Sequence, residues 1–321
     1  MPVIDLPALG YGAANIGNLY RPMSDEQAHA VLDAAWESGI RYFDTAPHYG
    51  LGLSERRLGT FLRTKPRGEF VLSTKVGRRL IPNPNGAAEL DLHNDFAVPA
   101  TQRRQWDFTA EGIRRSVEES LLRLGMDRVD IVYLHDPERF ELSSALATGI
   151  PAAVALRDEG VVAAIGVGSM NTLALQASVD TGALDLLMLA GRYTLLEQPA
   201  EEGILPACER HSTGVVLASV FNSGLLARDT LSPDARYEYG PVPSEIRLRH
   251  AALVAICRRH RIDIATAALQ FGHRHPAVRS VVAGAADPAQ IRQTAARMTA
   301  SVPDAFWTEL AHRRPVPVGT T

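Results

Sequence analysis

The sequence predicts an α/β protein built as a (β/α)8 TIM barrel. Three observations support this prediction. Eight short runs of apolar and β-branched residues alternate with segments of helical periodicity. The runs are too uniformly apolar to have one exposed face, which is typical of parallel strands covered on both sides. The length of 321 residues suits one large barrel, so we expect residues 1–321 to form a single barrel domain.

The expected strands and helices follow one another in regular order. The strands are expected over 8–13, 41–45, 70–76, 129–135, 162–169, 184–191, 214–220 and 280–285. The helices are expected over 24–38, 54–63, 109–124, 143–159, 171–181, 197–211, 244–260, 263–273 and 287–298. Ser24 with Gln27 three residues later is a typical helix start, and Gly39 a typical stop. An open doubly wound sheet is the alternative, but no G-x-G-x-x-G run follows the first strand.

Two connections are too long to be simple turns. Residues 77–108 and 221–243 are rich in Pro, Gly, Asn and Asp and follow the third and seventh expected strands. Long loops in compact domains are usually functional or disordered. In a barrel both lie over the C-terminal mouth, where active sites of this fold are found.

The charge, the apolar runs and the cysteines of the chain limit the kinds of molecule it is expected to bind. The net charge of -3 and the scattered arginine pairs leave no basic stripe, so we expect no nucleic-acid partner. No charged-then-apolar leader and no apolar run near the ~20 residues of a membrane helix occur, which favours a soluble, cytoplasmic protein without membrane contact. Cys208 and Cys257 lie far apart with no C-x-x-C, which predicts neither a disulfide framework nor a metal site.

Four chemically active side chains are expected at one rim of the barrel. Asp44, Lys75 and His135 lie at the ends of three different expected strands, and Tyr49 follows in the loop after the second strand. Lys75 is one of only two lysines among 33 cationic residues, and an uncompensated ammonium in an apolar strand is costly. Taken singly, Asp44 could cap a turn, Tyr49 could be an edge aromatic and His135 a core histidine. Their common position favours a catalytic set.

The four residue types suit proton transfer at a carbonyl or alcohol carbon. A phenol with a pKa of about 10 needs a nearby cation to exchange its proton at neutral pH. A unit charge about 4 Å away, at an effective dielectric of about 20, contributes roughly 4 kcal/mol, which Lys75 can supply to Tyr49. Asp44 would keep Lys75 ionised, and His135 could donate a hydrogen bond to the substrate oxygen. An alternative is a lyase in which Lys75 forms a Schiff base.

The segments "YFDTAPHYG…SERRLG", "STKVG" and "VYLHDP" resemble the catalytic segments of the aldo-keto reductase family. The resemblance covers essentially the whole chain. It implies nicotinamide-dependent hydride transfer, with Tyr49 as the acid/base and Lys75, Asp44 and His135 in the supporting roles. Another alternative is a nicotinamide-binding regulatory barrel, similar to the potassium-channel β subunits of this superfamily.

The resemblance also implies cofactor contacts. Ser169 and Asn171 in "GVGSMN" would hold the carboxamide, and Asn222, Ser223, Gly224 and Leu225 resemble the pyrophosphate loop. Ala190 replaces the family's glutamine, and the stacking tyrosine is missing near Ser219. Relatives that prefer NADP have a Lys and an Arg where this chain has Gly284 and Gln290. Asp287 could bond a ribose hydroxyl or cap a helix. We therefore expect NAD, with NADP possible.

Residues 18–59 are most similar to bacterial dehydrogenases that oxidise L-fucose and other D-threo aldoses at C1, and are also similar to pyridoxal 4-dehydrogenases. Both substrates are cyclic hemiacetals that give lactones. A general aldehyde or ketone reductase is a third alternative. Candidate substrate-binding residues, each of which could instead serve in packing, are Tyr20, His48, Trp106, Phe108 and Arg192. The partner expected is a small sugar or pyridoxal molecule, and the sequence does not predict an oligomeric state.

Overall fold

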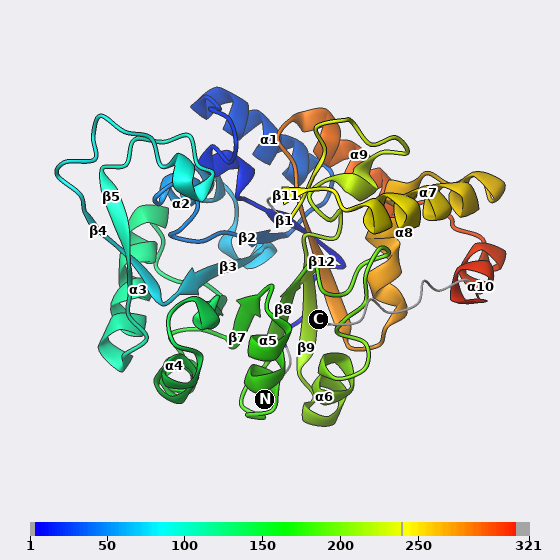
Figure 1. Ribbon diagram of the computed structural model, residues 1–321. Helices are drawn as coiled ribbons and strands as arrows, with labels where there is room; N and C mark the ends of the chain where they lie inside the picture. The colour runs from blue at the N-terminus through cyan, green and yellow to red at the C-terminus, as the bar shows by residue number, and fades with distance from the viewer. Residues whose placement is uncertain (1–3, 239, 313–321) are drawn as a thin grey trace.

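The computed structural model describes residues 4–238 and 240–312. Eight parallel strands close into a barrel in the order β1-β12-β9-β8-β7-β6-β3-β2, and helices surround it (Figure 1). The barrel strands are β1 Leu9–Gly12, β2 Tyr42–Asp44, β3 Val71–Val76, β6 Ile131–His135, β7 Ala164–Ser169, β8 Leu186–Ala190, β9 Gly214–Ala218 and β12 Val278–Gly284. The predicted (β/α)8 TIM barrel is confirmed.

The helices begin where capping residues allow it. Ser24 accepts from the Gln27 amide at 3.2 Å, and the Gln27 side chain accepts from the Ser24 amide at 2.9 Å, so the predicted capping box starts α1. The helices are α1 Asp25–Glu37, α2 Leu53–Leu62, α3 Ala110–Leu124, α4 Leu142–Asp158, α5 Thr172–Val179, α6 Ile204–His211, α7 Ser244–Arg259, α8 Ile264–Phe271, α9 Pro288–Met298 and α10 Asp304–His312.

The inside of the barrel is packed, and its polar atoms lead to the strand ends. The Tyr42 hydroxyl lies 3.1 Å from Ser73 Oγ and 3.3 Å from the Tyr133 hydroxyl. Ser73 in turn donates to Asp44 Oδ1 at 2.7 Å. Gly10 leaves room for the Tyr42 ring, because a Cβ there would be 2.6 Å from Tyr42 Cδ1. The core therefore supports Asp44 directly through a buried chain of hydroxyl groups.

The chain departs from the predicted elements in four places. Residues 77–108 contain an antiparallel hairpin of β4 Arg78–Pro82 and β5 Gln102–Trp106, and a short pair of strands, β10 Arg236–Tyr237 and β11 Gly240–Pro241, lies in the second long connection. The sixth helix begins at Ile204 instead of residue 197, because Glu197 closes a turn with Thr194. Helix α10 was not predicted, although it buries Phe306, Trp307 and Leu310 at helical spacing.

Within residues 4–238 and 240–312, no helix is both long and apolar enough to cross a bilayer. The same residues contain no group of three or more His, Cys, Asp and Glu side chains that could hold a metal ion. Cys208 and Cys257 are both free and buried.

Candidate active site

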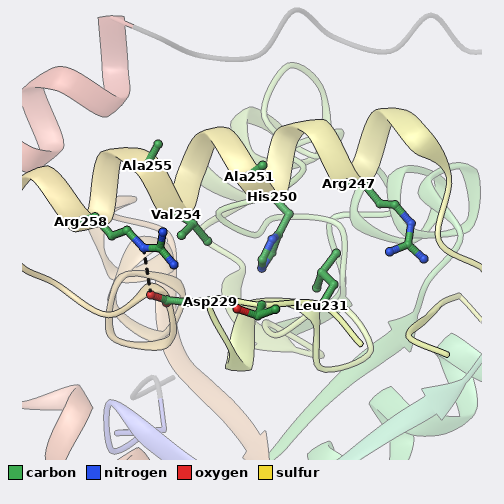
Figure 2. Close-up of a pocket in the computed structure, with 9 residues that line it drawn as sticks. Asp229, Leu231, Arg247, His250, Ala251, Val254, Ala255 and Arg258 are labelled. Carbon is green, nitrogen blue, oxygen red and sulfur yellow. Dashed lines mark ion pairs between the residues drawn. The ribbon is translucent and has the colours of Figure 1, made fainter. Parts of the chain in front are cut away.

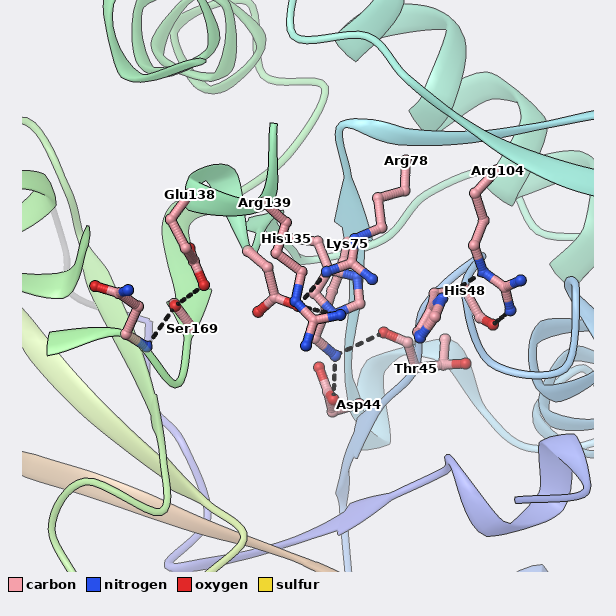
Figure 3. Close-up of polar contacts among 12 residues, drawn as sticks. Asp44, Thr45, His48, Lys75, Arg78, Arg104, His135, Glu138, Arg139 and Ser169 are labelled. Carbon is pink, nitrogen blue, oxygen red and sulfur yellow. Dashed lines mark hydrogen bonds and ion pairs between the residues drawn. The ribbon is translucent and has the colours of Figure 1, made fainter. Parts of the chain in front are cut away.

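A cavity of about 810 Å³ opens at the C-terminal ends of the barrel strands. Its volume falls within the roughly 300–1,000 Å³ of typical ligand sites. Tyr49 and His135 line it, while Asp44 and Lys75 are each 3% exposed. Figure 3 shows Asp44, Lys75 and His135 converging from β2, β3 and β6. The structure thus brings together all four residues predicted to be catalytic.

Lys75 and Asp44 form a buried ion pair. Lys75 Nζ lies 2.6 Å from Asp44 Oδ2 and donates to the Thr45 carbonyl oxygen at 3.0 Å. Burial alone would lower the pKa of Lys75, but the carboxylate of Asp44 and contact with Tyr49 raise it above its ordinary value. The ammonium group therefore stays charged. A Schiff-base mechanism needs a neutral amine, so this geometry argues against the lyase alternative.

Tyr49 is placed beside that charge. Lys75 Nζ lies 4.7 Å from the centroid of the Tyr49 ring. Burial raises the pKa of Tyr49, and the positive charge of Lys75 lowers it to a smaller extent. The phenol is therefore protonated at neutral pH, and Lys75 is the group that makes ionisation accessible.

His135 is neutral in this environment. Burial lowers the pKa of His135 well below its usual range, and the charges of Arg78 and Lys75 lower it further. Its ring is perpendicular to the Tyr49 ring, with centroids 6.0 Å apart. Nδ1 of His135 is buried and has no hydrogen-bond partner among the described residues. A neutral imidazole can donate one hydrogen bond to a substrate oxygen without adding charge.

The cavity is lined by residues that could hold a nucleotide. Five of the predicted cofactor-binding residues line it, namely Asn222, Ser223, Gly224, Gly284 and Gln290. Asn222 Oδ1 is buried without a hydrogen-bond partner among the described residues, so it is an acceptor that a bound ligand can satisfy. The backbone at Gly284 lies close to the Asn15 side chain, because a Cβ there would be 2.8 Å from Asn15 Oδ1. A nicotinamide nucleotide bound here would supply the hydride-accepting carbon.

The other predicted cofactor residues lie outside the cavity lining. Ser169 donates to Glu138 Oε1 at 2.7 Å, and Asn171 caps α5 by accepting from the Ala174 amide at 3.0 Å. Asp287 caps α9 by accepting from the Gln290 amide at 2.9 Å. Leu225 is buried in the core. Their roles toward a cofactor stay predictions.

The candidate substrate residues divide into two groups. Tyr20 and His48 line the cavity. Trp106 and Phe108 do not, and their rings stack at 6.1 Å between centroids. Arg192 pairs with Glu238 and donates to the Met170 carbonyl oxygen. For these last three the packing alternative has direct contacts to support it, and a substrate role stays a prediction.

Sequence reasoning missed several charged residues of the cavity lining, and three of them, Arg78, Asp136 and Arg139, lie around His135. Arg78 is 4% exposed, pairs with Asp136 and lies 4.5 Å from the Trp106 ring centroid. Arg139 also reaches Asp136, at 3.8 Å. Asp136 directly follows His135 and has a left-handed backbone with φ of 43°. A polar residue immediately after a predicted strand-end histidine was the available signal.

A second hollow of about 570 Å³ lies beside α7, next to Asp229 and Leu231 (Figure 2). His250 points into it but is already bonded through Nε2 to the Arg228 carbonyl oxygen at 2.9 Å. None of the four clustered residues lines this hollow, so the larger cavity is the candidate active site.

Comparison with known proteins agrees with this geometry. A family model described as the aldo/keto reductase family matches residues 8–312. The chain belongs to the aldo/keto reductase family. It is 57% identical to a D-threo-aldose 1-dehydrogenase from a Pseudomonas species over 97% of this chain and 95% of that protein. It is 37% identical to a pyridoxal 4-dehydrogenase from Microbacterium luteolum, over 96% of this chain and 94% of that protein.

Solved aldo/keto reductases share the fold at lower identity. A glycerol dehydrogenase from Gluconobacter oxydans superposes with a TM-score of 0.77 at 21% identity, covering 100% of this chain and 97% of that one. The holo form of an aldo-keto reductase from Bacillus halodurans superposes with a TM-score of 0.73 at 24% identity. The match covers 96% of this chain and 92% of that one. As an aldo/keto reductase, this chain is an oxidoreductase that uses a nicotinamide cofactor.

Proposed function

We propose that this protein oxidises an aldose of the L-fucose or D-threo type at C1 to the lactone, with Tyr49 as acid/base and NAD as the favoured acceptor. The substrate rests on one observation, the 57% identity to a D-threo-aldose 1-dehydrogenase over nearly the full length of both proteins. The chemistry rests on the buried Lys75–Asp44 pair beside Tyr49.

The reaction divides between two atoms of the sugar. Tyr49 as phenolate takes the proton of the anomeric hydroxyl. The O–H bond of that hydroxyl breaks as C1 becomes a carbonyl carbon. The C1–H bond breaks at the same time, and a nicotinamide held by the cavity residues would accept the hydrogen with both electrons of that bond. Lys75 stabilises the phenolate through its fixed positive charge. His135 donates to the C1 oxygen and holds it beside Tyr49.

NAD is favoured by the wall where an adenosine 2′-phosphate would lie. Gly284 and Gln290 line the cavity without positive charge, and the Gln290 side chain accepts from the Ala286 amide at 2.8 Å. A dianionic phosphate needs cationic partners to offset its desolvation. Arg297, the arginine of α9 that lines the cavity, is paired with Asp263 at 3.1 Å.

Pyridoxal is the second candidate substrate, because 37% identity to a pyridoxal 4-dehydrogenase extends over 96% of this chain. Pyridoxal also exists as a cyclic hemiacetal, so the same proton and hydride transfers would give 4-pyridoxolactone. A general aldehyde or ketone reductase would use the same four residues in the opposite direction.

An absorbance screen at the reduced-nicotinamide band tests the proposal. The purified protein is mixed with NAD or NADP and with L-fucose, D-arabinose, L-galactose or pyridoxal in turn. We expect turnover with the aldoses and a higher kcat/KM with NAD than with NADP. Turnover with pyridoxal alone would favour the second candidate. Turnover with neither class would overturn the proposed function.

A further inference from the structure

His48 lies next to the proposed acid/base and faces the cavity. Its ring centroid is 6.1 Å from that of Tyr49 and 5.6 Å from that of His135. It lines the same cavity as both. A substrate atom bonded to His48 would therefore lie near the C1 oxygen without being that oxygen, which Tyr49 and His135 already share.

Arg104 of β5 contacts His48 and does not itself line the cavity. Arg104 Nε donates to His48 Nδ1, and Nη2 donates to the His48 carbonyl oxygen at 2.9 Å (Figure 3). The same guanidinium group binds Asp91 with both Nη atoms, at 2.8 and 2.6 Å. Asp91 is 7% exposed and also accepts from Asn94 at 2.8 Å. His48 is thus held by a rigid, nearly buried clamp.

The clamp determines which ring nitrogen of His48 carries the proton. A guanidinium N–H can donate but never accept, so Nδ1 must present its lone pair to Arg104. The single proton of the neutral ring is therefore on Nε2. Nε2 has no hydrogen-bond partner among residues 4–238 and 240–312. The fold leaves one N–H donor at a fixed position on the cavity wall.

We propose that His48 Nε2–H binds the 2-hydroxyl oxygen of the aldose, so that His48 is a specificity-determining residue and Arg104 positions it. This inference rests on the proposed aldose oxidation. The 2-hydroxyl is adjacent to C1 and can accept a hydrogen bond. The ring oxygen is the other neighbour, but a donor there would withdraw electrons from the carbon that is losing hydride and slow the reaction. The 2-hydroxyl carries no such penalty.

A pair of sugars that differ only at this hydroxyl provides the test. D-Arabinose and 2-deoxy-D-ribose are related by loss of the 2-hydroxyl. With the native protein, we expect the deoxy sugar to lose about tenfold in kcat/KM, the order of one net hydrogen bond. His48→Phe should lose a similar factor with D-arabinose and nothing further with the deoxy sugar. If the loss of the 2-hydroxyl and the His48→Phe substitution each lower kcat/KM independently, so that the two factors multiply, the inference is overturned.

His48→Gln serves as the conservative variant, because the glutamine amide nitrogen can occupy the position of Nε2. We expect it to recover part of the discrimination between the two sugars that His48→Phe loses. Thermal melting checks that each variant is folded. If His48→Phe does not fold, the comparison of His48→Gln with the native protein on both sugars still decides the matter, since equal losses on both would contradict a contact to the 2-hydroxyl.

The role of Arg104 is tested by Arg104→Lys, which keeps the charge beside Asp91 but removes the Nε donor to His48. We expect KM for D-arabinose to rise while kcat and the kinetics of the deoxy sugar change little. Arg103→Lys, an exposed residue on the same strand, is the matched control. Equal effects of Arg104→Lys on both sugars would show that the clamp is only structural. Failure of the native protein to oxidise any aldose would overturn the proposed function instead, so the two failures are distinguishable.

Discussion

Lys75 Nζ lies 2.6 Å from Asp44 Oδ2 in a site where both side chains are almost fully buried. A charge with no partner in such a place is costly, so each member of the pair makes the other tolerable. The pair comes from neighbouring strands β2 and β3. The same contact therefore supports the barrel and supplies the positive charge beside Tyr49.

Removing one member of this pair should destabilise the protein more than removing both charges. We expect Lys75→Met to lower the free energy of unfolding by about 3–5 kcal/mol, because Asp44 is left buried and unpaired. The double variant Lys75→Met/Asp44→Asn should recover part of that loss. Urea unfolding measures both. Lys65→Met, at the only other lysine, is the control and should cost less than about 1 kcal/mol. A double variant no more stable than Lys75→Met would contradict the expectation.

Tyr49→Phe should separate chemistry from binding. The change removes the phenol while keeping the ring, so we expect turnover to fall about a hundredfold or more with an unchanged dissociation constant for NAD. Tryptophan fluorescence titration measures the binding, and steady-state kinetics the turnover. Tyr193→Phe removes a phenol that does not line the cavity and is the control. A Tyr49→Phe protein with native turnover would rule out Tyr49 as the acid/base.

The rate of oxidation should rise with pH. Oxidation needs the phenolate of Tyr49, and burial raises the pKa of that group. Below its pKa the reactive fraction grows as protons are removed, so kcat should increase across about pH 7 to 10. A kcat profile at saturating sugar and NAD measures this. The slope should vanish in Tyr49→Phe, and a profile that falls with pH over the same range would disagree with the assignment.

The preference for NAD over NADP should change when two residues of the wall expected beside the adenosine ribose are substituted. Gly284→Lys with Gln290→Arg should improve the ratio of kcat/KM for NADP over NAD about a hundredfold or more, since two charge-assisted hydrogen bonds of about 1.5–3 kcal/mol each contribute about 3–6 kcal/mol together. The lysine at 284 needs Asn15 to move, which a flexible side chain allows. Met at both positions adds similar bulk without charge and is the control. An equal shift in that control would remove the electrostatic explanation.

Sequence reasoning was strongest where residues lie on regular strands. Asp44, Lys75 and His135 were placed correctly at strand ends because barrel geometry fixes where those ends point. It was weakest in residues 77–108, where Arg78 meets Asp136 and Arg104 meets Asp91 across 58 and 13 residues of sequence. Such contacts depend on how a hairpin folds back, which no local pattern encodes. That residues 1–321 form one domain stays a prediction.

The contacts of Trp106 also could not be predicted from the sequence. An aromatic in a long loop over the barrel mouth is a candidate for a sugar contact, and for Trp106 that role stays a prediction. In the structure it stacks on Phe108 and covers the guanidinium of Arg78. Whether an aromatic faces a cavity or its neighbours is decided by the strand on which it lies, and β5 was not predicted.

The position of Arg104 on the β4–β5 hairpin has a consequence for engineering. The four residues proposed for proton transfer belong to the barrel strands or the loop after β2, whereas the clamp on His48 comes from an excursion between β3 and α3. The proposed acid/base Tyr49 and the proposed sugar contact His48 are adjacent in the loop after β2, but Arg104, which orients His48, comes from a different stretch of chain. A library randomised only within residues 83–104 includes Asp91 and Arg104 but leaves Lys75, Asp44, Tyr49 and His135 untouched, and is the natural starting point for selecting new sugar preferences by directed evolution.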